Sequence, residues 1–339
     1  MRSSAAILAV DGGASKVDAA LLRRDGSVIG AARVRTNGYE VTGDRAFLDD
    51  IGRAIEAACL VGDIEPERRP VARTGVFCLA GADLPVDDRR IARGLRARGW
   101  SGDDVLRNDT LAVLRAGTDR AWGVGLVCGS GMNCTGVSVG GTIFRFPALG
   151  TISGDWGGGR DLGDAALWHA VRAEEGRDDA TTLRGLVPGH FGLRRPRQLT
   201  EAIHIGRIDE HRLRELAPIV FAAAAAGDAV AQALVDRQAD EVIRMAGTAI
   251  RRLRMTATDP DVVLGGGIFR TNDRPFFDRI RRGLTSICAG ATVRVLTAPP
   301  VVGAAMLGLD LVSASRAAHR RAHDALTHER LAAHTRSRR

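Results

Sequence analysis

Runs of apolar residues separate polar turns in the first third of the chain and predict an alternation of strands and helices. Residues 7–10, 17–22 and 28–32 are short apolar segments of the length of buried strands, with Asp25-Gly26 as a turn between the last two. Further strands are predicted at 74–79 and 105–106, and helical spacing predicts helices over 45–60, 86–99 and 110–116. This alternation is typical of an α/β protein.

The rest of the chain repeats the opening order of strands and then becomes more helical. Strands are predicted at 123–127, 134–139 and 142–144, with the turn Gly140-Gly141 between the last two. Later strands are predicted at 261–264 and 292–296, and helices at 162–175, 210–226, 229–256, 275–290 and 302–312. Residues 177–197 form a polar stretch with Arg and Pro, for which we predict no regular element.

Each set of three strands contains a glycine-rich turn between its first two strands. The first turn is Asp11-Gly12-Gly13-Ala14-Ser15-Lys16, and the second is Cys128-Gly129-Ser130-Gly131-Met132-Asn133. Because glycine has no Cβ and adopts positive φ, such a turn can direct several backbone N–H groups at one phosphate. A single turn fits an ordinary hairpin equally well, but the same order used twice predicts two related halves that hold a nucleotide between them.

Length and composition describe a globular protein with two domains. At 339 residues, 45% hydrophobic and 26% charged, the chain is longer than one hydrophobic core usually supports. The formal net charge is +8, and the segment 313–339 holds seven Arg against two acidic residues. We therefore expect a flexible basic tail and no nucleic-acid partner.

Cysteine usage and apolar run lengths indicate the compartment. Five cysteines without regular spacing fit a reducing cytoplasm and no disulfide framework. Because no apolar run has the length of a membrane span or a signal core, we expect a cytoplasmic protein with no membrane partner. Lys16 is the only lysine in the sequence and lies in the first glycine turn, which makes it a candidate phosphate ligand; a solvent-exposed strand end is the alternative.

The order of these elements, together with eight short motifs, resembles the sugar kinase, heat-shock ATPase and actin superfamily. Within it the chain is most similar to the N-acetylglucosamine kinase and BadF/BadG/BcrA/BcrD-type ATPase family. The motifs are DGGASK (11–16), LAGAD (79–83), ND (108–109), CGSGMNC (128–134), GDWG (154–157), AAAGD (224–228), LGGGIF (264–269) and PPVVGAA (299–305).

The resemblance covers about residues 7–312. It implies an α/β fold of two related actin-like, ribonuclease H-like ATPase domains around a nucleotide cleft. The expected divisions are an N-terminal domain over 1–118, a C-terminal domain over 119–312 and the basic tail over 313–339.

By this resemblance, ATP and Mg²⁺ bind between the two domains. Asp11 would lie at the end of the first strand and hold Mg²⁺ through water. The residues that would surround the phosphates are Gly12, Gly13, Ser15, Lys16, Gly129, Ser130 and Gly131. The turn that would pass beneath the α-phosphate and adenosine is Gly265, Gly266 and Gly267, for which a plain strand-to-helix connection is the alternative. Phosphoryl transfer needs such neutralisation of the moving charge by metal and backbone amides.

Asp109 is the candidate general base. It follows a short strand and precedes a helix, so its carboxylate can project from the strand end into the cleft, where the family keeps a catalytic Asp. There it would accept the proton of the attacking sugar hydroxyl as the γ-phosphoryl group arrives. From the residues alone, the alternative role is the N-cap of the helix that begins at Thr110.

The resemblance also implies an acceptor site, from which this sequence departs at two positions. The implied sugar contacts are Asn37, Asp155, Trp156 and Gly157, with Trp156 as an ordinary core aromatic the alternative. Asp155 replaces the second Gly of the family's GGWG segment, and the family's substrate-contacting Asp falls on Leu162. The candidates for the missing carboxylate are Asp155, Asp161 and Asp164.

The implied function is phosphorylation of N-acetylglucosamine at O6 by a homodimer, with Asp109 as base and glucosamine or another hexose as the alternative acceptor. A second class is an ATPase that activates dehydratases through an iron–sulfur cluster, which requires paired, exposed Cys thiolates that these spacings do not offer. A third is a non-catalytic sugar sensor, which usually carries a helix-turn-helix before the first strand; we expect none here.

Overall fold

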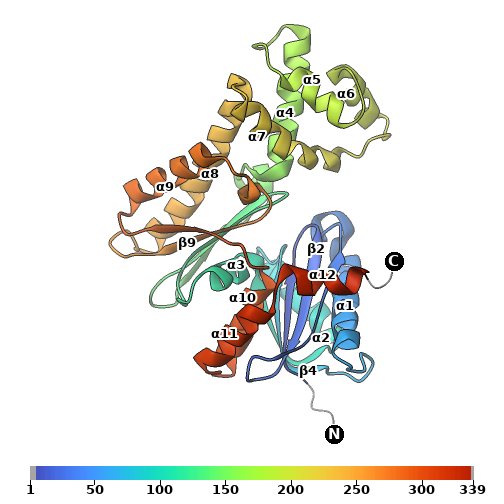
Figure 1. The fold of residues 1–339 in the computed structure, drawn as a ribbon, viewed down its shortest axis with the longest axis vertical. Coiled ribbons are helices and arrows are strands. Elements are labelled where there is room, and N and C mark those ends of the chain that lie inside the picture. The colour runs from blue at the N-terminus through green and yellow to red at the C-terminus, as the bar shows by residue number, and fades with distance from the viewer. Residues whose placement is uncertain (1–4, 337–339) are drawn as a thin grey trace.

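Two α/β halves, one above the other in Figure 1, make up the computed structural model, which describes residues 5–336. Each half contains a five-stranded mixed sheet, with strand orders β3-β2-β1-β4-β5 and β10-β9-β6-β7-β8. The strands of the first sheet are β1 (Ala5–Gly12), β2 (Lys16–Leu22), β3 (Val28–Arg35), β4 (Ala72–Leu79) and β5 (Ser101–Asn108). Those of the second are β6 (Gly123–Cys128), β7 (Met132–Val137), β8 (Ile143–Arg145), β9 (Asp261–Gly265) and β10 (Thr292–Val295).

The two sheets have the same topology. The strand β1 pairs antiparallel with β2 and parallel with β4, and β6 pairs antiparallel with β7 and parallel with β9. In each sheet a glycine-rich turn joins the antiparallel pair, and helices connect the parallel strands, as parallel pairing requires. The α/β class and the pair of related halves are therefore confirmed.

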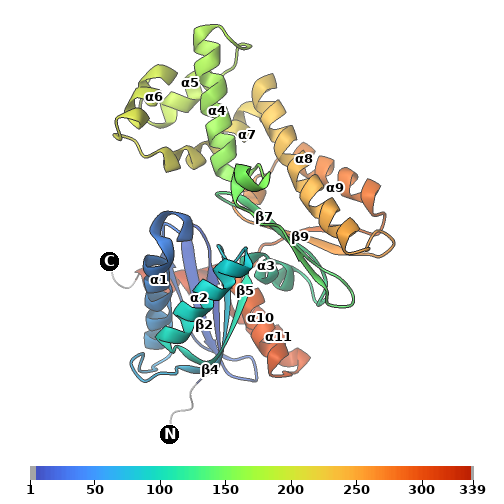
Figure 2. The ribbon, with the colours of Figure 1, turned by 180° about the vertical axis from the view of Figure 1, so that it is seen from behind.

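Helices cover both faces of the first sheet. Figure 2 shows α1 (Tyr39–Val61) and α2 (Pro85–Arg98) in front of it, while α3 (Asp109–Gly117) and α10 (Val301–Leu311) pack behind. Side chains along β1 alternate between these layers: Leu8 and Val10 join the core under α1 and α2, and Ile7 and Ala9 join the core under α10. A strand buried on both faces explains the continuous apolar run of β1.

The second half carries most of the remaining helices. The helices α8 (Ala229–Arg252) and α9 (Arg274–Ile287) pack with the sheet, and α4 (Gly158–Glu175), α5 (Leu183–His190), α6 (Pro196–His204) and α7 (Ala217–Ala225) extend beyond it (Figure 1). Three short 3-10 helices are η1 (Gly150–Ser153), η2 (Glu210–Leu216) and η3 (Ile268–Arg270).

Two segments of the second half differ from the prediction. The polar stretch 177–197 contains α5 and the start of α6, because Leu183, Val187 and Leu199 are fully buried and give these short helices an apolar face. The helix predicted over 210–226 begins as η2 and becomes α-helical only at Ala217. Both differences arise from tertiary burial that local spacing does not reveal.

The C-terminal segment also differs from the flexible tail that its charge predicts. It forms α11 (Arg316–Ala325) and α12 (His328–Arg336), and Ala318, Ala322 and Leu331 are buried against the first sheet. The division expected at residue 312 places α10 in the second half, yet α10 packs on β1 and α3. The chain thus returns to the first half near Pro300 and completes its core there.

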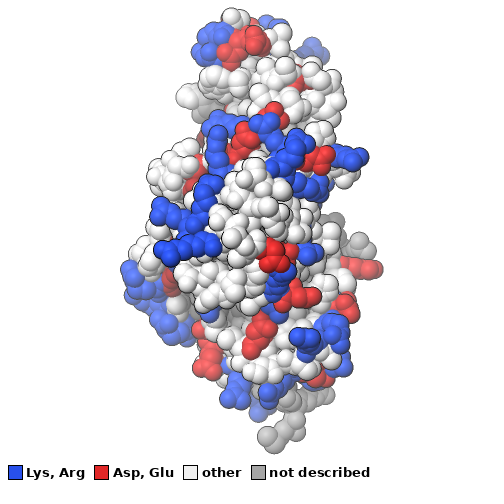
Figure 3. Space-filling model, turned by 90° about the vertical axis from the view of Figure 1, so that its left-hand side faces the viewer, with Lys and Arg blue, Asp and Glu red and all other residues white. Residues whose placement is uncertain are grey.

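Charge and hydropathy are distributed as follows. On the face drawn in Figure 3, Lys and Arg side chains gather at mid-height, and both acidic and basic side chains are interspersed below.

In the described part of the chain no single helix is long and apolar enough to cross a membrane. The bent pair formed by 210–225 and Ala229–Arg252 passes by length and composition only together, and both of its helices contribute to the core of the second half.

Replacing Gly26 with Ala should cost more stability than replacing Gly141. Both glycines have positive φ, 82° and 84°, but only at Gly26 would the added methyl group collide with the carbonyl of Ala318 in α11. We expect Gly141→Ala to lower the free energy of unfolding by about 1 kcal/mol and Gly26→Ala by about 1–3 kcal/mol more. Urea unfolding measures both losses, and equal losses would show that α11 does not occupy this position in solution.

Candidate functional site

Three carboxylates lie at the carboxyl ends of neighbouring parallel strands. Asp11 is the next-to-last residue of β1, Asp83 follows β4, and Asp109 follows β5 as the first residue of α3. Because β1, β4 and β5 are parallel neighbours in that order, their carboxyl ends meet at one edge of the sheet. This edge faces the second half of the molecule (Figure 1), which is where ligands bind in open α/β sheets.

Burial raises the pKa of each of these carboxyl groups, and neighbouring acidic side chains add to the effect. Burial, followed by the charges of Asp83 and Asp11, raises the pKa of Asp109 to about 8. Burial is also the main reason that the pKa of Asp83 rises to about 7 and that of Asp11 to about 6. Carboxylates with proton affinity near neutral pH are suited to general base catalysis.

The N-cap of α3 is Asn108, which leaves Asp109 without that role. The side-chain Oδ1 of Asn108 accepts a hydrogen bond from the backbone N–H of Thr110 at 3.1 Å. Asn108 itself is buried, whereas Asp109 keeps part of its surface exposed. The structure therefore decides against the capping alternative for Asp109.

A hydrogen-bonded network joins the two halves beside Asp109. The Oδ1 atom of Asp83 accepts from Asn108 Nδ2 at 2.8 Å and from Asn133 Nδ2, on β7 of the second half, also at 2.8 Å. The hydroxyl of Thr110 donates to that of Thr135, again across the halves, at 2.6 Å. Asp83 and Asn133 are not among the site residues predicted from the sequence, although the motifs LAGAD and CGSGMNC contain them.

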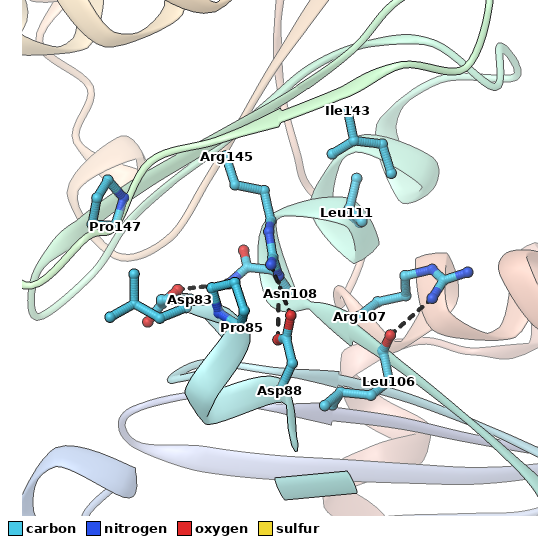
Figure 4. A pocket seen from close by; sticks show the side chains of 11 residues that line it. Asp83, Pro85, Asp88, Leu106, Arg107, Asn108, Leu111, Ile143, Arg145 and Pro147 are labelled. Carbon is cyan, nitrogen blue, oxygen red and sulfur yellow. Dashed lines mark hydrogen bonds and ion pairs between the residues drawn. The ribbon is translucent and has the colours of Figure 1, made fainter. Parts of the chain in front are cut away.

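A cavity of about 520 Å³ opens next to this network (Figure 4). Its walls come from α2, β5 and α3 of the first half and from β8 of the second. Arg145 crosses between them, with Nη2 2.7 Å from Asp88 Oδ2 and Nη1 3.1 Å from the carbonyl oxygen of Ala82. A second set of bonds therefore ties the halves together along one side of the cavity.

The first glycine turn ends at Lys16, which belongs to an ionic cluster with Asp18 and Arg33. Asp18 is fully buried, and its carboxylate accepts two hydrogen bonds from Arg33, at 2.6 and 2.7 Å, and one from Lys16 at 2.7 Å. These partners lower the pKa of Asp18 against the effect of burial. Lys16 Nζ is also 3.6 Å from Asp11 Oδ2, so the only lysine lies between two carboxylates rather than in solvent.

The glycines of the first turn have different physical roles. A Cβ on Gly12 would lie 2.7 Å from Leu79 and 2.9 Å from Phe47, so close packing excludes a side chain there. The N–H of Gly13 closes the turn on the carbonyl oxygen of Lys16 at 3.0 Å, and Ser15 is exposed. The N–H of Thr36 donates to the carbonyl oxygen of Ser15 at 3.2 Å, which brings the neighbouring Asn37 close to this turn. The side chain of Asn37 is exposed.

The second and third glycine turns lie side by side. Gly266, with φ of 110°, packs directly on the backbone of Cys128. No atom of the described residues comes within 4 Å of a Cβ built on Gly129, Gly131 or Gly267, so these positions border open space. Gly265 is different, because a Cβ there would meet Val113 of α3 at 2.8 Å.

The segment expected to contact sugar is attached to the second glycine turn. The N–H groups of Gly159 and Arg160, at the start of α4, donate to the carbonyl oxygens of Gly129 at 2.8 Å and Ser130 at 2.9 Å. Gly157 donates its N–H to Asp161 Oδ2 at 2.6 Å. The amino end of α4 and the glycine turn thus form one unit.

The side chains of this segment are already engaged. Asp155 is buried and accepts from Ser153 Oγ at 2.5 Å, and the guanidinium carbon of Arg237 is 3.9 Å from the ring centre of Trp156. Leu162, where the family carboxylate falls, is fully buried in the core of the second half. Asp164 is exposed, and burial of part of its side chain raises its pKa.

The cysteines do not offer the paired, exposed thiolates that an iron–sulfur cluster between subunits requires. All five are buried as free thiols, and burial raises the pKa of Cys128 and Cys134 far above the usual range. Within residues 5–336 no group of three or more His, Cys, Asp or Glu side chains is arranged to hold a metal ion. A Mg²⁺ ion bound largely through phosphates and water needs only one or two carboxylates, and the buried Asp11 can supply one.

Comparison with known proteins identifies relatives of this chain. The model of the BadF/BadG/BcrA/BcrD ATPase family matches residues 8–308. The N-acetylmuramic acid/N-acetylglucosamine kinase of Clostridium acetobutylicum is 23% identical over 285 residues, which cover 82% of this chain and 90% of that protein. The N-acetyl-D-glucosamine kinase of Dictyostelium discoideum is 22% identical over 312 residues, covering 89% and 97%.

Among solved structures, a protein from Chromobacterium violaceum described as a candidate N-acetylglucosamine kinase has the same fold. Its TM-score is 0.71 at 21% identity, over 89% of this chain and 98% of that one. The comparison therefore supports an actin-like arrangement of two domains for the whole matched region.

Asp109→Asn should stabilise the protein at alkaline pH. A raised pKa means that the folded state holds a proton which the unfolded state releases above about pH 4, so Asp109 lowers stability as pH rises through 4 to 8. Since Asn does not ionise, we expect the variant to be about 1–3 kcal/mol more stable than wild type at pH 8.5 and nearly equal at pH 4. Urea unfolding at both pH values measures the difference in free energy of unfolding between the variant and the wild type. The control is Asp103→Asn, at an exposed position on β5. A difference that does not depend on pH would contradict the prediction.

Proposed function

This chain belongs to the BadF/BadG/BcrA/BcrD ATPase family, and from that premise we propose that it transfers the γ-phosphoryl group of ATP to a hydroxyl group of N-acetylglucosamine. The coarser assignment, an ATP-dependent sugar kinase, follows from the family and from both curated relatives. The observation that carries the proposed transfer to a hydroxyl group is the position of Asp109, a carboxylate of raised pKa at the sheet edge between the halves. The choice of N-acetylglucosamine rests on the names of the two curated relatives.

Asp109 acts as the general base in this proposal. Its carboxylate accepts the proton of the acceptor hydroxyl while that oxygen bonds to the γ-phosphorus and the bond from phosphorus to the ADP oxygen breaks. A pKa of about 8 makes it a stronger proton acceptor than an ordinary carboxylate, at the expense of being only partly ionised at neutral pH. The capping by Asn108 fixes where the first turn of α3 presents it.

The three glycine turns form the proposed nucleotide site. From the first half, the proposed phosphate contacts are Gly12, Gly13, Ser15 and Lys16; from the second, they are Gly129, Ser130, Gly131, Gly265, Gly266 and Gly267. The open space beside Gly129, Gly131 and Gly267 supports this assignment, since it leaves room for an anion next to these turns. The N–H of Gly129 closes the second turn on the carbonyl oxygen of Gly131 at 2.9 Å.

Asp11 is the proposed ligand of Mg²⁺, directly or through water. Its carboxylate is buried, and burial raises its pKa to about 6 even with Lys16 nearby, so a divalent cation would relieve the cost of its charge. Bound there, Mg²⁺ would supply positive charge to the phosphates. Lys16 is held by Asp18 on the same side of the turn and adds a second cation.

The acceptor contacts are proposed on the resemblance, with support from their placement. They are Asn37 beside the first glycine turn and Asp155, Trp156 and Gly157 beside the second. Because the Clostridium relative is named for N-acetylmuramic acid as well, that sugar is a second candidate acceptor, with glucosamine a third. We extend the proposal to a cytoplasmic homodimer that phosphorylates O6, as the resemblance implies.

A coupled assay of ADP release tests the proposed reaction. With Mg·ATP, N-acetylglucosamine should accelerate ADP release over water alone, and Asp109→Asn should lower kcat by about 10²–10⁴-fold because the base is removed. The acceptor series is N-acetylglucosamine, N-acetylmuramic acid, glucosamine, N-acetylmannosamine and glucose. Asp103→Asn, on the same strand and exposed, should match the wild type.

Two outcomes would contradict the proposal. ADP release that no sugar accelerates would exclude a sugar acceptor and favour an ATPase coupled to a protein partner. Sugar-dependent release that persists in Asp109→Asn would exclude Asp109 as the base while leaving the kinase assignment intact.

A further inference from the structure

The segment formed by Ala82 and Asp83 is held from both halves of the molecule. From the first half, Asn108 Nδ2 donates to the carbonyl oxygen of Ala82 at 3.2 Å and to Asp83 Oδ1 at 2.8 Å. From the second half, Arg145 donates to the same carbonyl oxygen at 3.1 Å, and Asn133 donates to Asp83 Oδ1 at 2.8 Å. No role in the reaction is assigned to this segment by its sequence motif alone.

One carboxylate oxygen thus connects two parts of the proposed site. On one side, Asn108 immediately precedes Asp109 and caps the helix that Asp109 begins. On the other side, Asn133 comes two residues after Gly131 of the second glycine turn, and its own Oδ1 accepts the N–H of Cys134 at 2.7 Å. Both ends of the Asn133 amide are therefore engaged, and its Nδ2 also lies 3.4 Å from Asn108 Oδ1. Asp83 is thus one of the contacts across the halves that position this part of β7.

We propose that Asp83 is a positioning residue for phosphoryl transfer, which sets the separation between Asp109 and the second glycine turn by accepting both amides on one oxygen. This inference rests on the proposed function. Transfer between groups carried by two halves depends on their alignment to within about 1 Å, so a bond that spans the halves at this point acts on the rate more than on the affinity for either substrate.

The surroundings of Asp83 explain why its bonds can form and break. It lines the cavity of Figure 4, and the charged groups near it are Asp87 of α2, Asp109 of α3 and Arg145 of β8. Arg145 is committed to Asp88, so the two amides are the direct partners of the Asp83 oxygen. Hydrogen bonds beside a cavity can exchange with water, as opening and closing of two domains requires.

Two substitutions at Asp83 separate hydrogen bonding from charge. Asp83→Asn keeps an oxygen that can accept both amides, whereas Asp83→Ala removes it and leaves the two N–H groups without that acceptor. We expect Asp83→Ala to lower kcat for the preferred sugar about 10–100-fold, with both KM values within about threefold, and Asp83→Asn to restore most of the rate.

Asp88→Asn is the matched control. Asp88 lies on the same side of the cavity and also bonds across the halves, through Arg145, but it does not contact Asn108 or Asn133. We expect its kcat within about threefold of wild type. The double variant Asp83→Ala/Asn133→Ala should lose less than the product of the two single losses in kcat, because the bond between these two residues is removed by either change.

Scattering provides a readout that does not depend on activity. Without ligands, Asp83→Ala should have a larger radius of gyration than wild type, because the halves are less firmly joined, and Asp83→Asn should not. A wild type that phosphorylates no sugar defeats the proposed function alone, and scattering then tests the inference. Superimposable curves for wild type and Asp83→Ala, or equal kcat losses in the Ala and Asn variants, would overturn it.

Discussion

The burial of like charges at the carboxyl ends of parallel strands is the constraint on which the site depends. Parallel pairing of β1, β4 and β5 brings the chain after each strand to one edge, and there the sequence places Asp11, Asp83 and Asp109. In an ordinary core this arrangement would be avoided, because burial disfavours each charge and, at Asp109, the charges of Asp83 and Asp11 raise the pKa further. The fold tolerates it since the edge opens toward the other half, where cations and hydrogen-bond donors can reach it.

The surrounding structure offsets this repulsion in two different ways. Beside Asp11, the buried pair of Asp18 and Arg33 holds Lys16 close by as a fixed positive charge. Beside Asp109, neutral amides from Asn108 and Asn133 bind Asp83 without adding charge. The first arrangement suits the binding of an anionic nucleotide. The second leaves the pKa of the Asp83 carboxyl group at about 7. Both depend on side chains that are far apart in the sequence.

Much of the fold could be predicted because its signals are local. The buried strands, the two glycine-rich turns and their repeated order follow from apolar runs and glycine positions, and the structure confirms them. The helices α5 and α6 could not be predicted in the same way, since their apolar faces become clear only when Leu183 and Leu199 meet α4 and α7. The C-terminal helices look like a charged tail until Leu331 and its neighbours are seen against the first sheet.

The site shows the same limit. Asp11 and Asp109 could be selected because the family resemblance implies roles for the residues at these strand ends, but only the geometry distinguishes Asn108 as the cap of α3. Asp83 could not be selected for a related reason. It is paired with Asn133, fifty positions away in the sequence, and a contact between two domains leaves no regular spacing in the sequence that would predict it. The role of each residue in the reaction remains a prediction.

The return of the chain to the first half has a consequence for synthesis on the ribosome. Ile7 and Ala9 are made before the second half, yet the helices that bury one of their faces, α10 and α11, are made after it. The face of the first sheet that α10 and α11 cover therefore stays without these helices while the second half is translated. Folding of the first half depends on contacts of very long sequence separation. The second half is continuous from β6 to β10, so all the segments of its own core are available before α10 is made.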